Sequence, residues 1–222
     1  MFVGHYGASY AIRAARPAIP LWLLFIAVQL IDVVWALLVL VGIEKARIVP
    51  GITASNPFDL YYMPYTHSLV AAIVWAMAAT AACRSRPRFR TGTAAIWVGV
   101  AVFSHWVFDF VVHRPDLPLY DDTMKMGLGL WNFPVIAFAL EAALLFGGMA
   151  LYLRKTTSVD AVGRFGPATF GIIMLAIQAW IFFGPPPASP AAAAVTALVS
   201  YVAFAALVRW LDGRREPVGA RP

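Results

Sequence analysis

The chain has 222 residues, of which 61% are hydrophobic and only 13% are charged. Soluble domains typically have ~45–50% apolar and ~25% charged residues. With a mean hydropathy of +0.75, a domain of this size has no interior large enough to hide so much apolar surface from water. The composition therefore predicts a membrane protein and excludes disordered, collagen-like and coiled-coil chains. The single cysteine, Cys83, excludes an internal disulfide and a cysteine-based metal knuckle.

Six apolar stretches follow one another along the chain, each close to the ~20 residues that a helix needs to cross a bilayer. They span residues 20–43, 64–83, 91–113, 131–153, 166–184 and 190–211. The first stretch is too long for the ~7–15-residue core of a signal peptide, so we expect a retained helix. The predicted fold is an all-α, polytopic membrane helix bundle. We expect one transmembrane domain over residues 1–222, with a metal-site half over 1–153 and two structural helices and a basic tail over 154–222.

The basic residues alternate in density between the two sides of the predicted bundle. Of the 17 lysines and arginines, 13 lie in the N-terminal segment, the second and fourth loops and the tail, and four lie in the first and third loops. The positive-inside rule then places both termini in the cytoplasm. The net charge of +6 reflects this topology, and we expect no nucleic-acid partner. The 13 are Arg13, Arg16, Arg84, Arg86, Arg88, Arg90, Arg154, Lys155, Arg164, Arg209, Arg214, Arg215 and Arg221.

Several ionisable side chains lie inside or beside the first four predicted helices. Each costs at least ~2.5–3.5 kcal/mol in the bilayer centre unless it finds a partner or water. The four-residue spacing in the third helix places two histidines and an aspartate on one face. With ~1.5 Å of rise per residue, the set converges at roughly 18–28 Å from the basic side. The residues are Asp32, His67, His105, Asp109, His113 and Glu141.

His5 can reach the same level if the N-terminal segment folds back into the bundle. Residues 3–15 would form a short re-entrant helix that turns near Arg16, Pro17 and Pro20 and packs antiparallel on the first long helix. Such a segment is tolerated only where protein buries it. An amphipathic helix at the membrane surface is the alternative.

Two interpretations of these polar residues stay open. Taken singly, His67 and His113 could mark a membrane interface, Glu141 could form a helix–helix hydrogen bond, and Asp32 could be packing glue. Taken together, histidines and carboxylates at one level with almost no basic partner favour a bound divalent cation. Nitrogen and carboxylate ligands suit zinc or a similar metal.

The order of these residues resembles a bacterial inner-membrane family of predicted metal-dependent hydrolases that includes LexA-regulated members. The resemblance covers about residues 1–113, and the first helix carries one carboxylate where two are common in the family. It implies a multi-pass protein of the bacterial inner (plasma) membrane. The matching features are His5, Asp32, Tyr65-Thr66-His67-Ser68-Leu69 and Ser104-His105-x-x-x-Asp109.

The resemblance implies metal-assisted hydrolysis, and the position of the site in the outer half of the membrane suggests a lipid, lipid-linked or periplasmic substrate. We expect Asp32, His67, His105 and Asp109 as ligands, with His5 and His113 as further ligands or their supports. Glu141 is the candidate general base, since it is the remaining carboxylate. The alternatives are a metal or proton carrier that uses the same residues and a purely structural membrane bundle. The oligomeric state stays open.

Overall fold

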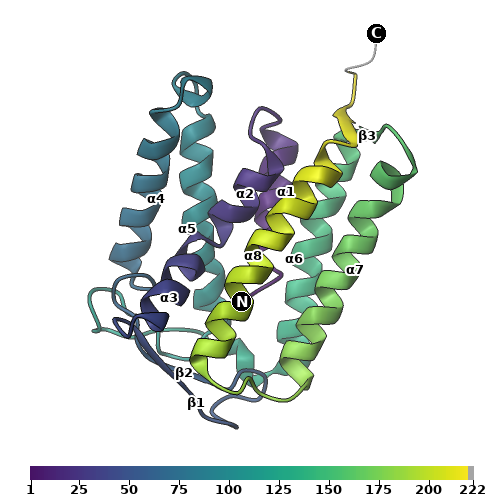
Figure 1. The fold of residues 1–222 in the computed structure, drawn as a ribbon. Coiled ribbons are helices and arrows are strands. Elements are labelled where there is room, and N and C mark those ends of the chain that lie inside the picture. Colours follow the sequence, from purple (N-terminus) through teal and green to yellow (C-terminus); the bar gives the residue numbers. More distant parts are fainter. Residues whose placement is uncertain (220–222) are drawn as a thin grey trace.

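The structure, a computed structural model, describes residues 1–219 and is a bundle of α-helices with two small two-stranded sheets (Figure 1). Arg221 of the predicted basic tail lies outside the described residues. The strands are β1 (Lys45–Ile48) with β2 (Phe58–Tyr62) and β3 (Thr156–Ser158) with β4 (Arg215–Pro217), and both pairs are antiparallel. Short 3₁₀ turns are η1 (Pro87–Phe89) and η2 (Leu130–Asn132). The helices are α1 (His5–Ala15), α2 (Leu21–Val28), α3 (Leu30–Leu40), α4 (Leu69–Arg84), α5 (Ala94–Val112), α6 (Pro134–Arg154), α7 (Ala161–Phe183) and α8 (Pro190–Asp212).

Four helices in the described part of the chain, α5, α6, α7 and α8, are long and apolar enough to cross a membrane. The bent pair of α2 and α3 passes the same test as a single span, which gives up to five. Helix α4 is also apolar but has only 16 residues, or about 24 Å. The all-α bundle is thus confirmed, with four candidate membrane spans among the described residues, and the count of six spans stays a prediction.

The stretch predicted as one helix over 20–43 is two helices that meet at an angle of 50°. The break falls at Gln29, whose φ of −105° and ψ of 5° leave the helical region. Its side-chain amide donates to the carbonyl of Phe2 at 3.2 Å. The hydropathy of the stretch is continuous across the break, so composition alone does not reveal it.

The N-terminal segment enters the bundle, as the re-entrant alternative predicts. Helix α1 packs against α6 and α2, and His5, Tyr6 and Tyr10 are all buried. The approach to α6 is backbone to backbone, because a Cβ at Gly7 would collide with the carbonyl of Leu144 and one at Gly148 with Gly7 itself. Met1 therefore lies inside the bundle rather than at either end of it (Figure 1).

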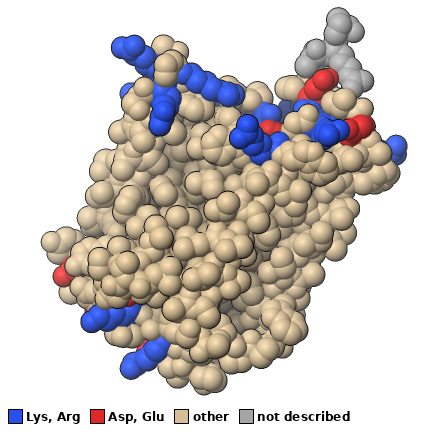
Figure 2. Space-filling view, in the orientation of Figure 1, with Lys and Arg blue, Asp and Glu red and all other residues tan. Residues whose placement is uncertain are grey.

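Basic side chains cluster at one end of the bundle (Figure 2). This end carries the turn between α4 and α5 and the β3–β4 strand pair, and the middle of the visible face is a broad band without charged groups. The opposite end carries the β1–β2 hairpin and a few basic residues (Figures 1 and 2). We call these the basic end and the hairpin end.

Candidate metal centre

All four histidines of the chain meet two aspartates in the bundle interior. Four of them lie in the helices α1, α3 and α5, and two lie next to helix ends: His5 begins α1, Asp32 lies in α3, and His67 precedes α4. The rest belong to α5, which carries His105 and Asp109 and ends at His113. The structure thus brings together all six residues that the sequence suggests as metal ligands.

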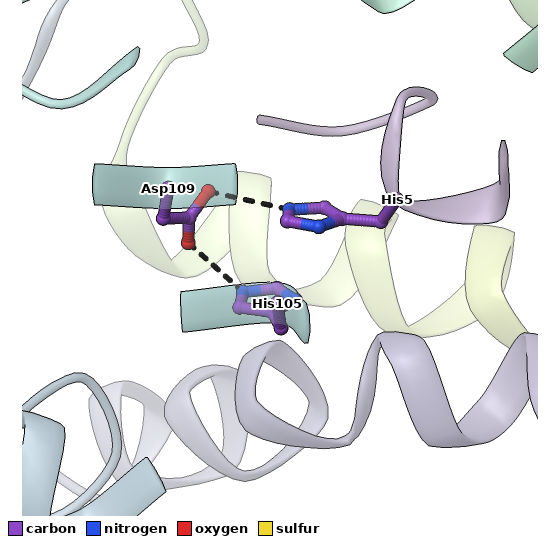
Figure 3. A group of neighbouring side chains, drawn as sticks. All are labelled: His5, His105 and Asp109. Carbon is purple, nitrogen blue, oxygen red and sulfur yellow. Dashed lines mark ion pairs between the residues drawn. The ribbon is translucent and has the colours of Figure 1, made fainter. Parts of the chain in front are cut away.

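Asp109 is the centre of this cluster. Its Oδ2 lies 3.0 Å from Nε2 of His105, and its Oδ1 lies 3.2 Å from Nε2 of His5 (Figure 3). The imidazole rings of His5 and His105 stack with centroids 3.9 Å apart. Nε2 of His67 and of His113 lie 3.8 and 3.7 Å from the same Oδ2. One buried carboxylate therefore faces the Nε2 atoms of four imidazoles.

Asp32 is the second carboxylate of the cluster. Its Oδ1 lies 3.3 Å from Nε2 of His67 and 3.4 Å from Nε2 of His105. Its Oδ2 accepts a hydrogen bond of 2.9 Å from the hydroxyl of Tyr201 in α8. The Asp32 side chain is 18% exposed against 2% for Asp109, so it is the carboxylate of the cluster that is open to its surroundings.

In three of the imidazoles, Nδ1 points away from the aspartates and forms a hydrogen bond with an acceptor oxygen. His105 Nδ1 lies 2.7 Å from the carbonyl of Val28, at the break between α2 and α3, and His113 Nδ1 lies 2.9 Å from Asp116. A carbonyl or carboxylate oxygen can only accept here, so Nδ1 carries a proton, and Nε2, which faces the aspartates, is the atom that a neutral ring would offer to a metal. This is the arrangement that orients histidine ligands in metal sites.

His67 also carries a proton on Nδ1, and two side chains, Thr66 and Glu44, hold it there. Thr66 Oγ1 donates to Glu44 Oε2 at 2.6 Å, so it can only accept from His67 Nδ1, at 2.8 Å. Glu44 Oε1 also accepts from the backbone amides of Tyr65 and Thr66 at 2.8 and 3.0 Å. Burial raises the pKa of Glu44 above that of a free glutamate, while these hydrogen bonds and the nearby His67 act in the opposite direction.

Four nitrogen–oxygen distances in the cluster are close to those between the ligands of a tetrahedral metal site. Ligands bound at ~2.0–2.2 Å in a tetrahedron lie about 3.3–3.6 Å from one another. The four nitrogen–oxygen distances that connect His67 and His105 to Asp32 and Asp109 are 3.0, 3.3, 3.4 and 3.8 Å. Nε2 of His105 and both nitrogens of His5 are buried without a hydrogen-bond partner. The buried histidines and aspartates could therefore hold a metal ion, in two overlapping groups that share His105.

A charge network at the hairpin end supports His113. Asp116 accepts from His113 with one oxygen and from Arg114 Nε, at 3.1 Å, with the other. Arg114 also contacts Asp59 of β2, which accepts from Arg47 Nε at 2.6 Å. This chain of alternating charges ties the β1–β2 hairpin to the end of α5.

Glu141, the predicted general base, has other partners. One oxygen accepts from the backbone amides of Phe2 and Gly4, at 2.9 and 3.1 Å, and the other accepts from Gln178 Nε2 at 2.9 Å. The same N-terminal segment brings the Met1 amino group within 2.6 Å of Asp109 Oδ1. Glu141 therefore holds the segment that delivers His5 to the cluster.

A cavity of about 500 Å³ lies beside the cluster. Asp32, His67, Asp109, His113 and Glu141 all contribute to its wall. The remaining wall comes from the N-terminal segment, the β1–β2 connection, Trp131 and the facing parts of α7 and α8. A small molecule or part of a lipid could reach the acidic and imidazole groups through it.

Some residues of the site carry no signal that a single sequence reveals. Tyr201 and Gln178 lie in the two helices assigned a structural role by sequence, yet they contact Asp32 and Glu141 and line the cavity. Glu44 sits in a loop 22 residues before Thr66. Asp116 was not predicted either, although its position three residues after His113 is a signal that could have identified it.

Comparisons with known protein families, curated proteins and solved structures find no match for this chain. The resemblance to inner-membrane hydrolases thus stays an expectation from short motifs. The function has to be argued from the geometry of the site.

Proposed function

We propose that this chain is a membrane-embedded, metal-dependent hydrolase. One observation supports this proposal best. Three imidazoles use Nδ1 for hydrogen bonds to acceptors, and their Nε2 atoms face two carboxylates beside a cavity. His67, His105, Asp32 and Asp109 would hold the metal, with His5 and His113 next to them. The proposed location is the bacterial inner membrane with six spans, α4 and the bent α2–α3 pair each counting as one.

Zinc is the first candidate for the metal. Imidazole nitrogens and carboxylate oxygens form a donor set that zinc accepts, and each of the two three-residue groups would leave the fourth tetrahedral position free for water. Two carboxylates also balance the charge of a divalent ion, which matters because an unbalanced charge is costly at this depth in a membrane.

With three of these residues as ligands and a water in the fourth position, a metal would lower the pKa of that water and polarise the electrophile. Asp32 is the group best placed to accept a proton from the cavity, because it is the more exposed carboxylate and its Oδ2 is held by Tyr201. Glu141 remains the alternative proton acceptor, although its hydrogen bonds favour the role of holding residues 1–5 in place.

The proposed topology places the basic end of the bundle in the cytoplasm. Figure 2 shows the basic side chains gathered there, as the positive-inside rule requires. The cluster and its cavity then open towards the outer half of the membrane. For the amino terminus, the cytoplasmic assignment applies to the turn between α1 and α2, because Met1 itself is buried.

A metal or proton carrier is the competing function, and it needs a polar route through the bundle. Between the cluster and the basic end, the interior is filled by buried apolar and aromatic side chains, among them Tyr10, Phe25, Val98 and Val102. The cavity leads to the hairpin end and to the space between α7 and α8. This one-sided access supports an enzyme over a carrier.

Metal analysis of the purified protein tests the proposal. Wild type should hold a divalent metal in near-stoichiometric amount, and His105→Ala and Asp109→Asn should each weaken binding by more than ~100-fold, because the loss of a ligand exceeds the effect of losing a support. Cys83→Ser is the control and should keep the metal. Unchanged metal content in both ligand variants would overturn the proposal.

A second measurement separates hydrolase from carrier. Metal-loaded protein in vesicles of bacterial lipids should release a hydrolysis product detectable by mass spectrometry, and Asp109→Asn should not. Metal uptake into the vesicles without any product would favour the carrier.

A further inference from the structure

The cavity beside the cluster continues as a groove between α7 and α8. On α8 its wall consists of Ala192, Ala193, Thr196, Ala197, Ser200 and Tyr201. These positions recur every four residues and so occupy one face of the helix. Ile177, Gln178 and Ile181 of α7 form the opposite wall. We call this space the α7/α8 groove.

The two hydroxyl groups on the α8 wall do not make the groove polar. Thr196 Oγ1 donates to the carbonyl of Ala192 at 2.9 Å, and Ser200 Oγ donates to the carbonyl of Thr196 at 2.8 Å. Both hydroxyls are thus satisfied by their own helix, and the face presents methyl and methylene groups. With isoleucines opposite, the groove is lined by hydrocarbon.

The groove opens where the surrounding solvent is lipid. Ile181, Ala192 and Thr196 line the cavity and are exposed at the surface of α7 and α8, both of which are candidate membrane spans. From Ala192 to Tyr201 the groove follows nine residues of helix, about 14 Å. That length is about half of the ~30 Å hydrocarbon core.

The inner end of the groove is polar and incompletely satisfied. Tyr201 donates to Asp32, so the end of the α8 wall contacts the His/Asp cluster directly. On the other wall, Gln178 is 1% exposed, and its Oε1 has no hydrogen-bond partner. A ligand in the groove would therefore contact hydrocarbon along its length. At its inner end it would contact the free Gln178 Oε1 and the His/Asp cluster.

We propose that the α7/α8 groove binds one hydrocarbon chain of a bilayer lipid and places the polar end of that lipid at the His/Asp cluster. The proposal rests on the hydrolase function argued above and defines its substrate class as a membrane lipid that enters sideways from the bilayer. A second copy of the chain could also dock on small residues of α8, but a helix would cover the mouth of the groove and leave its inner end unfilled.

Photo-crosslinking in nanodiscs tests the proposal with phosphatidylethanolamine that carries a diazirine in one acyl chain. Wild type should be labelled at the buried Gln178 as well as at Ile172, which is 62% exposed on the outside of α7. Ala197→Leu fills the groove and should lower the labelling of Gln178 relative to Ile172 by roughly tenfold, because a packed space does not accept added methyl groups cheaply.

Ala203→Leu is the matched control, since it makes the same change on an exposed face of α8 outside the groove. It should leave the labelling ratio at its wild-type value. Absence of label at Gln178 in wild type, or an equal ratio in both leucine variants, would overturn the proposal. So would efficient disulfide dimers of Ala193→Cys in a Cys83→Ser background, because they would show a second copy at the groove.

Metal content measured on the same samples keeps the two proposals separate. Bound metal with no label at Gln178 would overturn the lipid groove and leave the metal centre standing. Label at Gln178 in a wild-type sample without metal would support the groove and remove the hydrolase.

Discussion

His105 and His67 face the same two aspartates, but the molecule holds them in different ways. His105 is fixed by a backbone carbonyl, that of Val28, which the break between α2 and α3 presents to it. His67 is fixed by two side chains, Thr66 and Glu44, brought together from the two ends of the β1–β2 hairpin region. A backbone support survives most substitutions, whereas a side-chain support can be removed or reversed by one. We therefore expect substitutions of the groups that support His67 to change metal binding more than substitutions near the support of His105.

The largest effect in this comparison is expected for Glu44→Gln. The glutamine oxygen can still accept from the amides of Tyr65 and Thr66, but its NH₂ would donate to Thr66 Oγ1. Thr66 would then donate its own proton to His67 Nδ1 and move the ring proton to Nε2, where it blocks the metal. Metal affinity should fall ~10–100-fold, the usual effect of losing a support of a histidine ligand. Titration with zinc in detergent measures it.

Two further variants test the direction of this hydrogen-bond chain. Thr66→Ser keeps the hydroxyl and should bind metal like wild type, whereas Thr66→Val should resemble Glu44→Gln. Wild-type affinity in both Glu44→Gln and Thr66→Val would show that the proton on His67 is not set from this side.

A smaller effect is expected for Asp116→Asn. The asparagine oxygen can still accept from His113 Nδ1, so the variant loses mainly the charge pair with Arg114. His113 also stands 3.7 Å from Asp109, outside the four closest donor contacts. An ion pair of this kind contributes up to ~1 kcal/mol, so metal affinity should fall less than about fivefold. A loss as large as that of Glu44→Gln would make His113 a full ligand.

Local spacing explains which parts of this arrangement could be predicted from the sequence. His105 and Asp109 are four residues apart on one helix, and hydropathy marks most of the spans, so the six candidate ligands and the bundle follow from the pattern. The re-entrant α1 follows from the distance of His5 and Asp32 to the prolines between them.

The remaining features depend on contacts that no short pattern encodes. Tyr201 reaches Asp32 across 169 residues and Gln178 reaches Glu141 across 37, so their helices look purely structural in sequence. The bend at Gln29 depends on its bond to the Phe2 carbonyl, which exists only once the N-terminal segment has entered the bundle. In each case a tertiary contact decided the role of a residue whose local sequence is neutral.

The smallest effect on metal binding is expected for Glu141→Gln, and it decides between the roles open to Glu141. The glutamine oxygen can keep the bonds from the amides of Phe2 and Gly4, and its NH₂ then faces Gln178. Gln178 can turn its amide and accept with Oε1, which has no partner in the native protein. The free energy of unfolding should therefore change by less than ~1 kcal/mol and the metal should stay bound.

Glu141→Ala removes the acceptor altogether and should cost about 1–3 kcal/mol, because buried amides lose their partner. Thermal unfolding, metal analysis and product release on both variants give three separate readouts. If Glu141→Gln keeps metal and stability but loses ~10²–10⁴-fold in turnover, Glu141 is the general base after all and not only the anchor of the N-terminal segment.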